Sequence, residues 1–285
     1  MSNSIIKIGL DKRDKMIYAA RVKTDKTRFE IKALIRLNSE FPLKHDLIED
    51  GDLHFAIPDS QAMLKQIRIS PESQYSTHEQ AKFEMIQSVL EDESVFSFES
   101  EETSQANNII GAIFRKERSD KLIASYNANN FDKNRIKKFR VRSLALGKGY
   151  LNFCHPETGE LACIADFCKE VVSICLIYQK KILNVASIDL QKFDFLNEND
   201  IDKITMEFKT ILNFKLSSIF DKGITVPLSS LMIIGGNEQL VNKFSDYFKL
   251  KPFLPKINHG FFSNPKKLEQ IPLHNYLIAL GLSVD

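Results

Sequence analysis

The sequence has few of the residue patterns that identify a function class by themselves. Its four cysteines, at positions 154, 163, 168 and 175, include no CxxC pair, and its six histidines are scattered without a pair at metal-ligand spacing. We therefore expect no metal site and no histidine-based catalytic centre. The cysteines are expected to be buried thiols in a reducing compartment.

The chain also lacks an excess of charge of one sign and a long apolar run. Its 39 Lys and Arg residues nearly balance its 37 Asp and Glu residues, giving a formal net charge of +2. No overall attraction to nucleic acid is therefore expected. A membrane-spanning helix needs about 20 apolar residues, and no run reaches that length. Because the first residues also lack a signal-peptide pattern, we predict a cytoplasmic protein.

One pattern occurs twice, in segments that are far apart in the chain. Each time, an apolar strand reaches an aspartate, turns through a few polar residues and returns as a second strand. The first copy contains Asp11 and returns over residues 16–22, and the second contains Asp166 and returns over residues 171–178. The duplication predicts two related lobes.

The remaining segments read as alternating strands and helices. After a three-stranded meander over residues 5–36, the residues up to about 140 form a mixed series of strands and helices. The clearest helical pattern in the second half spans residues 200–220. Further strands are predicted at 53–58, 64–69, 108–114 and 228–234, and further helices at 78–90, 119–129, 143–153, 237–248 and 274–282.

The order of these elements resembles that of the PilM family, the cytoplasmic actin-like proteins of type IV pilus assembly. This family is related to the division protein FtsA and to the cytoplasmic part of the secretion protein GspL. The resemblance spans nearly the whole chain. It rests on segments similar to the family's first strand, subdomain strands, helix glutamate, adenosine motif and closing helix: Ile8–Asp11, Phe55–Ser60, Ile67–Pro71, Glu84, Ile233–Leu240 and Tyr276–Leu282.

The resemblance implies an α/β class protein with a duplicated actin-like, ribonuclease H-like fold of two lobes. Residues 1–155 would form the first lobe, with an α+β subdomain inserted at about 53–140. Residues 156–285 would form the second lobe, and the last helix, 274–282, could pack back on the first.

The turns that should hold phosphate depart from the family pattern. The family's loops place glycine after each aspartate, because backbone N–H groups must approach the phosphates closely. Here Lys12-Arg13-Asp14 and Phe167-Cys168-Lys169 stand in those places. Each aspartate could orient a hydrated Mg²⁺, or it could end its strand and hydrogen-bond its own turn, and we favour the second. The residues that would hold a nucleotide, if one is bound, are Asp11, Lys12, Asp166, Gly235 and Gly236.

Our leading hypothesis from the resemblance is a non-catalytic pseudo-ATPase that acts as a cytoplasmic scaffold. It would belong to a type IV pilus or type II secretion-like assembly platform and work peripherally at the inner membrane. A short peptide tail of an inner-membrane partner would dock between the first subdomain and the inserted one, which needs no phosphate chemistry. A motor ATPase and further copies of the chain, in an oligomer or ring, are additional candidate partners.

The alternative is a slow, active ATPase that uses ATP and magnesium, with phosphates held by Lys12, Arg13 and Lys169. A carbohydrate kinase ranks third, because it would need a catalytic aspartate beside an intact phosphate loop. On the leading hypothesis we expect no cofactor.

Basic residues are concentrated in residues 133–142. Arg135, Lys137, Lys138 and Arg140 are our candidates for a contact with anionic lipid headgroups or an acidic partner. The favoured alternative is an ordinary solvated edge strand, and another is internal pairing with the acidic residues of 91–102. Nucleic acid ranks lower, because Phe139 is the only aromatic residue within the run.

Overall fold

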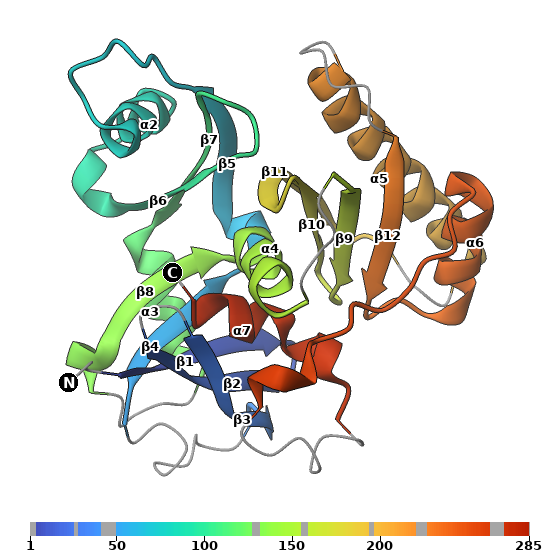
Figure 1. Ribbon diagram of the computed structural model, residues 1–285, viewed down its shortest axis with the longest axis horizontal. Coiled ribbons are helices and arrows are strands. Elements are labelled where there is room, and N and C mark those ends of the chain that lie inside the picture. Colours follow the sequence, from blue (N-terminus) through green and yellow to red (C-terminus); the bar gives the residue numbers. More distant parts are fainter. Residues whose placement is uncertain are drawn as a thin grey trace.

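The computed structural model (Figure 1) describes residues 4–25, 28–40, 50–126, 132–154, 159–193, 197–220, 227–262 and 271–284. The N-terminal part forms a five-stranded sheet in the order β3-β2-β1-β4-β8. β1, β2 and β3 are antiparallel, as the predicted meander requires, whereas β4 runs parallel to β1 and β8 runs parallel to β4. The strands are β1 (Ile5–Arg13), β2 (Met16–Asp25), β3 (Arg28–Asn38), β4 (Asp52–Ile57) and β8 (Ile136–Val141).

A subdomain is inserted between β4 and β8. Its three strands lie in the order β5-β7-β6, and α2 packs on them through Ala81 and Met85. Ser76 caps α2 in a reciprocal capping box with Glu79, which fixes the start of this helix. The elements are η1 (Asp59–Gln61), β5 (Ala62–Arg68), α2 (Thr77–Ile86), η2 (Glu93–Val95), β6 (Phe96–Glu102), β7 (Asn108–Arg115), α3 (Lys116–Ala124) and η3 (Lys133–Arg135).

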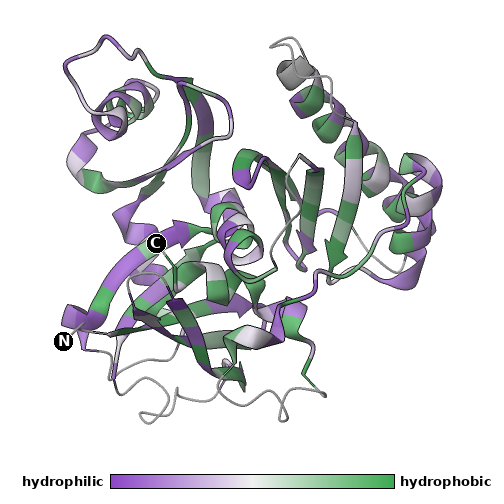
Figure 2. Cartoon of the chain, in the orientation of Figure 1, coloured by the Kyte–Doolittle hydropathy of each residue, from purple (hydrophilic) through white to green (hydrophobic). Residues whose placement is uncertain are grey.

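The second sheet has the order β11-β10-β9-β12. Its central strands are buried on both faces, which explains their almost continuous apolar sequences, drawn in green in Figure 2. Two helices cover one face, with Ile204, Phe208 and Phe244 in the core between them and the sheet. The elements are β9 (Leu161–Phe167), β10 (Val171–Tyr178), β11 (Lys181–Asp189), α5 (Glu198–Phe220), β12 (Leu228–Ile234) and α6 (Glu238–Phe248).

Two helices, α4 (Arg142–Phe153) and α7 (Leu277–Leu282), cross between the sheets. α4 packs on β10 and β11, while α7 packs on β1, β2 and β4. The crossing is very close, because a Cβ atom at Gly281 would lie 1.8 Å from the Ala145 carbonyl oxygen. Side chains from both sheets and both helices form one core cluster, so the two lobes share a hydrophobic interior. Two short turns complete the fold, η4 (His259–Phe261) and η6 (Leu273–Tyr276).

Candidate functional site

Two arginines join the aspartates of the duplicated hairpins across the boundary between the lobes. Arg13 donates from Nε to Asp11, at 2.7 Å, and from Nη1 to Asp166, at 2.9 Å. Arg142 donates from Nη1 to Asp11, at 2.8 Å, and from Nη2 to Asp166, at 2.7 Å. We call these four residues the arginine clamp. They come from β1, β9 and the first residue of α4.

The clamp is buried, and all four carboxylate oxygens of its two aspartates take part in hydrogen bonds. The side chains of Asp11 and Asp166 are fully buried, and those of Arg142 and Arg13 are only 3% and 11% exposed. Each of the four carboxylate oxygens accepts a hydrogen bond from one of the guanidinium groups. Two positive and two negative charges therefore compensate each other in a largely buried site.

The protonation states in the clamp follow from these contacts. Burial alone would lower the pKa of Arg142 and of Arg13, but the nearby carboxylates outweigh burial and raise the pKa of both arginines. Both therefore stay charged at any physiological pH. Burial also raises the pKa of Cys168 to about 12, so its Sγ is a neutral thiol that accepts a hydrogen bond from Arg142 Nη2 at 2.9 Å.

The position of Asp11 within its strand explains how Arg13 reaches it. β1 continues through Arg13, which pairs with Met16, and the hairpin turn is formed by Asp14 and Lys15. Residues two apart on a strand share a face, so Asp11 and Arg13 point the same way. Our expectation that Asp11 ends the strand and hydrogen-bonds its own turn is therefore wrong. The carboxylate has a guanidinium partner instead.

For Asp166 the same expectation is only partly wrong. This residue lies inside β9, which ends one residue later at Phe167, and the turn is closed by a hydrogen bond from Cys168 N to the Val171 carbonyl oxygen. The carboxylate accepts from the two arginines and also, at 3.8 Å, from the Cys168 thiol of its own turn. Both hairpins therefore direct an aspartate to the same place between the lobes.

Lys12 faces away from the clamp. As the residue between Asp11 and Arg13, it points to the opposite face of the sheet, where Nζ donates to the Ser125 carbonyl oxygen at 2.5 Å. The amino group also lies 6.0 Å from the centre of the Tyr126 ring. Of the three basic residues in the ATPase alternative, Arg13 belongs to the clamp, Lys12 lies on the other face and Lys169 is exposed at the β9–β10 turn.

Gly235 and Gly236 follow β12 beside the end of β9. Gly235 has φ +78°, and a Cβ atom there would lie 2.3 Å from the Phe167 carbonyl oxygen, so packing alone requires glycine. The two glycines border a pocket of about 470 Å³. Asn275, which also borders it, accepts a hydrogen bond from Arg13 Nη2 at 3.0 Å and separates the pocket from the clamp. The rest of the lining is Ile233, Val241, Pro252, Phe253, Leu254 and His274.

These residues do not fit a magnesium nucleotide. A metal at Asp11 or Asp166 would have to share with an arginine, or take from it, every carboxylate oxygen that it used, and it would lie beside two guanidinium charges. The turns after the two aspartates offer no glycine for a close approach to phosphate. Within the described part of the chain, no three His, Cys, Asp or Glu side chains are grouped to hold a metal ion.

A third buried carboxylate, Asp59, joins the lobes beside the clamp. It lies at the start of the inserted subdomain and accepts hydrogen bonds from Ser173 Oγ on β10 and from the Ser143 backbone N–H, at 3.2 Å, in the first turn of α4. A carboxylate at a helix N-terminus is stabilised by the helix dipole. Burial is the larger effect, however, and raises the pKa of Asp59.

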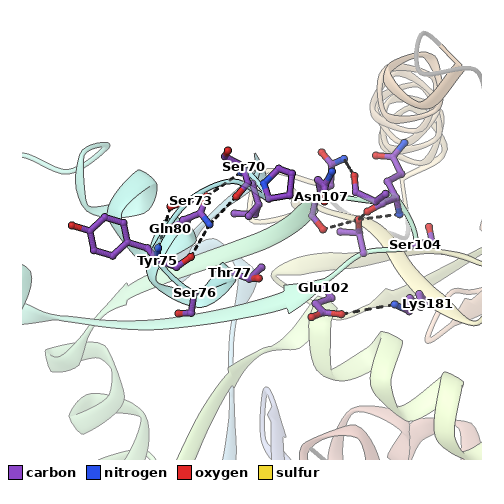
Figure 3. Close-up of a pocket in the computed structure, with 16 residues that line it drawn as sticks. Ser70, Ser73, Tyr75, Ser76, Thr77, Gln80, Glu102, Ser104, Asn107 and Lys181 are labelled. Atoms are coloured by element: carbon purple, nitrogen blue, oxygen red, sulfur yellow. Dashed lines mark hydrogen bonds and ion pairs between the residues drawn. The ribbon is translucent and has the colours of Figure 1, made fainter.

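The inserted subdomain also touches the second lobe directly. Ser104 N donates to the Ile182 carbonyl oxygen at 3.1 Å, and Asn184 Nδ2 donates to Gln66 Oε1 at 3.4 Å. Beside this contact lies a pocket of about 520 Å³, lined mainly by hydroxyl and amide side chains (Figure 3). Its two charged lining residues are Glu102, from the inserted subdomain, and Lys181, from the second lobe. Glu102 Oε2 and Lys181 Nζ lie 3.8 Å apart. With these charges balanced, the pocket has no excess of positive charge for a phosphate.

Strand β6 meets β8 where the inserted subdomain joins the first lobe. Glu99 and Arg140 are both buried there, with 3.8 Å between Glu99 Oε1 and Arg140 Nε. Arg140 Nε and Nη1 and Glu99 Oε2 have no hydrogen-bond partner among the described residues. Burial raises the pKa of Glu99 to about 7, against the opposing effect of Arg140. This junction is therefore less completely hydrogen-bonded than the clamp.

The basic run is divided between surface and interior. Lys137 is exposed, Lys138 is half-buried, and Arg135 donates from Nε and Nη2 to the Gly51 carbonyl oxygen, at 2.9 and 2.6 Å. Arg140 is only 5% exposed, so it does not belong to an outward-facing surface. Most ion pairs of the acidic residues 91–102 are formed with basic residues outside 133–142. These pairs are Glu91 with Arg115, Glu93 with Lys82, Glu101 with Lys148 and Glu102 with Lys181. Glu99 alone pairs with a member of the basic run, Arg140.

Arg142 is the site residue whose role the sequence did not reveal. Arg142 is the last residue of the basic run and lies 131 positions from Asp11 in the sequence. Nothing in the sequence of that run distinguishes it from the other basic residues. The available signal was indirect: two buried-type strands each carry an aspartate without glycine, and buried carboxylates need positive partners. Arg13, two residues after Asp11 on one strand, was the nearest such partner.

The fold is similar to that of solved actin-like structures. One is the PilM–PilN type IV pilus biogenesis complex, with a TM-score of 0.68 and 15% identity over 97% of each chain. Another is a Bacteroides thetaiotaomicron protein with an actin-like ATPase fold and unknown function, with a TM-score of 0.54 and 10% identity over 98% of this chain and 96% of that one. No protein-family model and no curated protein matches the sequence.

Among the described residues, no helix is long and apolar enough to cross a membrane. The duplicated hairpins, the two sheets and the crossing helices agree with the likeness to these structures over nearly the whole length. The chain therefore has the two-lobed actin-like ATPase fold, in a form similar to that of PilM.

Proposed function

We propose that this protein is a nucleotide-independent scaffold in an assembly platform of the type IV pilus or type II secretion kind. It works at the cytoplasmic face of the inner membrane and binds a short peptide tail of a membrane partner. The observation that carries nucleotide independence is the arginine clamp. Because a guanidinium N–H already binds each oxygen of Asp11 and Asp166, a metal or its water shell would have to compete with two buried arginines for these carboxylates.

The partner class is supported by the fold and by an edge strand. The similar PilM structure is described as a complex with PilN, so this fold occurs in a protein–protein assembly. In our chain, β8 is an edge strand of the first sheet and lies where the inserted subdomain joins it. A strand edge can bind an extended peptide through main-chain hydrogen bonds. We place the peptide on this edge, with a motor ATPase and further copies of the chain as additional partners.

Isothermal titration calorimetry of the full chain tests both halves of the proposal. With Mg-ATP we expect no binding tighter than roughly 1 mM, because the charge-assisted hydrogen bonds of a glycine loop are missing and every 1.4 kcal/mol is about tenfold in affinity. A micromolar dissociation constant would instead favour the slow ATPase.

The second titrant is a set of synthetic peptides that cover the cytoplasmic tails of inner-membrane proteins encoded beside this gene. We expect one tail to bind, and Lys137→Glu, at an exposed position of β8, to weaken that binding. The matched control is Lys32→Glu, an exposed lysine on β3, the opposite edge strand of the same sheet. If neither variant changes the affinity, the peptide does not dock on β8, and if no tail binds, the scaffold proposal fails.

A further inference from the structure

We propose that the arginine clamp is a lock that holds the two lobes in one orientation without any bound ligand. The lock consists of a closed ring of four ionic hydrogen bonds, in which each arginine contacts an aspartate of each lobe. It concerns the conformation of the chain alone, so it is independent of which partner the scaffold binds.

The ring connects three elements by buried ionic hydrogen bonds. Asp11 and Arg13 belong to β1 of the first sheet, Asp166 belongs to β9 of the second, and Arg142 begins α4 between them. Arg13 Nη2 also donates to the Asn275 carbonyl oxygen, which adds the turn before α7 to the same network. Separation of the lobes would therefore break bonds to both arginines at once.

The ring needs arginine and not merely a positive charge. A guanidinium group carries several N–H donors in a fixed plane, so one arginine can bind two carboxylates in defined directions. A lysine ammonium is a point charge on a flexible stem and would not hold the same geometry. Loss of one member also leaves a buried charge without its partner, which is strongly destabilising. The locked orientation should therefore be sensitive to single, conservative substitutions.

Asp59 forms a second set of buried hydrogen bonds between the lobes, beside the ring. Arg142 and Ser143 are consecutive residues in the first turn of α4, where Arg142 contacts the clamp and Ser143 donates to Asp59. Ser173 of the second sheet donates to the same Asp59 carboxylate. The first turn of α4 is thus fixed to both lobes by buried polar contacts.

The lock also determines where the inserted subdomain lies. That subdomain follows Asp59 in the chain and reaches the second lobe at Ile182 and Asn184. Figure 3 shows the neighbouring polar pocket, in which Glu102 of the subdomain faces Lys181 of the second lobe. If the lobes turn relative to each other, this pocket must change shape.

The test compares wild-type protein with Asp11→Asn and Arg142→Lys, using hydrogen–deuterium exchange and small-angle X-ray scattering on the full chain. Asp14→Asn is the matched control, because Asp14 is exposed and its φ of +52° suits asparagine. We expect both clamp variants to exchange at least tenfold faster at 11–13, 166–170 and 273–276, and to scatter as a more extended molecule. The interior of α5 should exchange at the wild-type rate, because it lies away from the clamp.

Arg142→Lys keeps the net charge and serves as the test if Asp11→Asn does not fold. Wild-type exchange should also stay the same when Mg-ATP is added. Unchanged exchange and scattering in the clamp variants would overturn the proposal, as would a uniform rise across both lobes, which indicates only general destabilisation. A nucleotide-dependent change in the wild-type pattern would overturn it too. None of these outcomes depends on peptide binding, so the proposed function is tested separately.

Discussion

At the two hairpin aspartates, the neighbouring backbone decides whether the carboxylates can serve a metal nucleotide. Phosphate needs backbone N–H groups at short range, which glycine permits, and the residues after Asp11 and Asp166 carry side chains instead. Two buried carboxylates without a cation would be unfavourable, so they need positive partners within the protein. Arg13 and Arg142 supply these partners, and the site becomes a structural contact.

The effect of burial on the pKa of a single residue can be tested at Glu99. Burial raises its folded-state pKa to about 7, whereas a glutamate in the unfolded chain titrates near pH 4.3. Between these values the folded protein binds more protons, so the free energy of unfolding should fall as the pH rises from about 4.5 to about 7 and stay low above that. One pKa unit corresponds to about 1.4 kcal/mol, which gives a total of about 3–4 kcal/mol.

Urea unfolding at about pH 5 and about pH 8 measures this loss, and Glu99→Gln should remove it. Glu72→Gln is the control, because Glu72 is an exposed glutamate outside the junction and its replacement should leave the wild-type pH dependence in place. An equal pH dependence in wild type and Glu99→Gln would show that Glu99 stays ionised in the folded protein.

At the level of elements, apolar periodicity predicted most of the fold. The stripe on residues 200–220 corresponds to α5, whose Ile201, Ile204, Phe208 and Leu212 are buried, and the three-stranded meander is confirmed as β1 to β3. β6 was missed, because its glutamates interrupt the apolar pattern, and they are accommodated through pairing with bases on other elements. Such pairing depends on tertiary contacts that periodicity does not contain.

The crossing of α4 and α7 supplies a prediction at this scale. Gly281→Ala would place a Cβ atom 1.8 Å from the Ala145 carbonyl oxygen and 2.6 Å from Gly149 N, so the two helices must move apart. Overpacking of this kind costs about 1–3 kcal/mol and sometimes more. We expect a loss of at least that size in the free energy of unfolding, measured with urea.

Gly260→Ala is the matched control for that substitution. A Cβ atom there would meet only the Asn258 side chain, whose Oδ1 would lie 3.2 Å away in an exposed turn, so the change should stay within about 0.5 kcal/mol. If Gly281→Ala proves as mild as Gly260→Ala, the helices have room that the structure does not show.

At the scale of the whole molecule, the sequence predicted the two-lobed architecture but not the clamp. The architecture follows from a pattern that is present twice in the chain, and each copy can be read locally. The clamp depends on Arg142 meeting Asp11 across 131 positions and Asp166 across 24, which requires the relative placement of both sheets and α4. No local pattern distinguishes an arginine directed inward at a helix start from one that is solvated.

The basic run gives the last prediction, because its effect depends on how the whole surface meets a membrane. Lys133 and Lys137 are exposed, whereas Arg140 and Arg142 are buried and contact carboxylates. Each basic residue near an anionic surface contributes about 1 kcal/mol. Two exposed lysines should therefore give only weak, salt-sensitive co-sedimentation with anionic vesicles and none with neutral ones.

Replacing both Lys133 and Lys137 with serine should abolish that co-sedimentation and leave thermal stability unchanged. Arg140→Ser should lower the thermal stability and leave co-sedimentation unchanged, because it removes a buried partner of Glu99 and does not alter the exposed surface. The two variants thus separate a surface role from a structural one within a single run of basic residues. Equal sedimentation of the double variant and the wild type would show that this run does not contact the membrane.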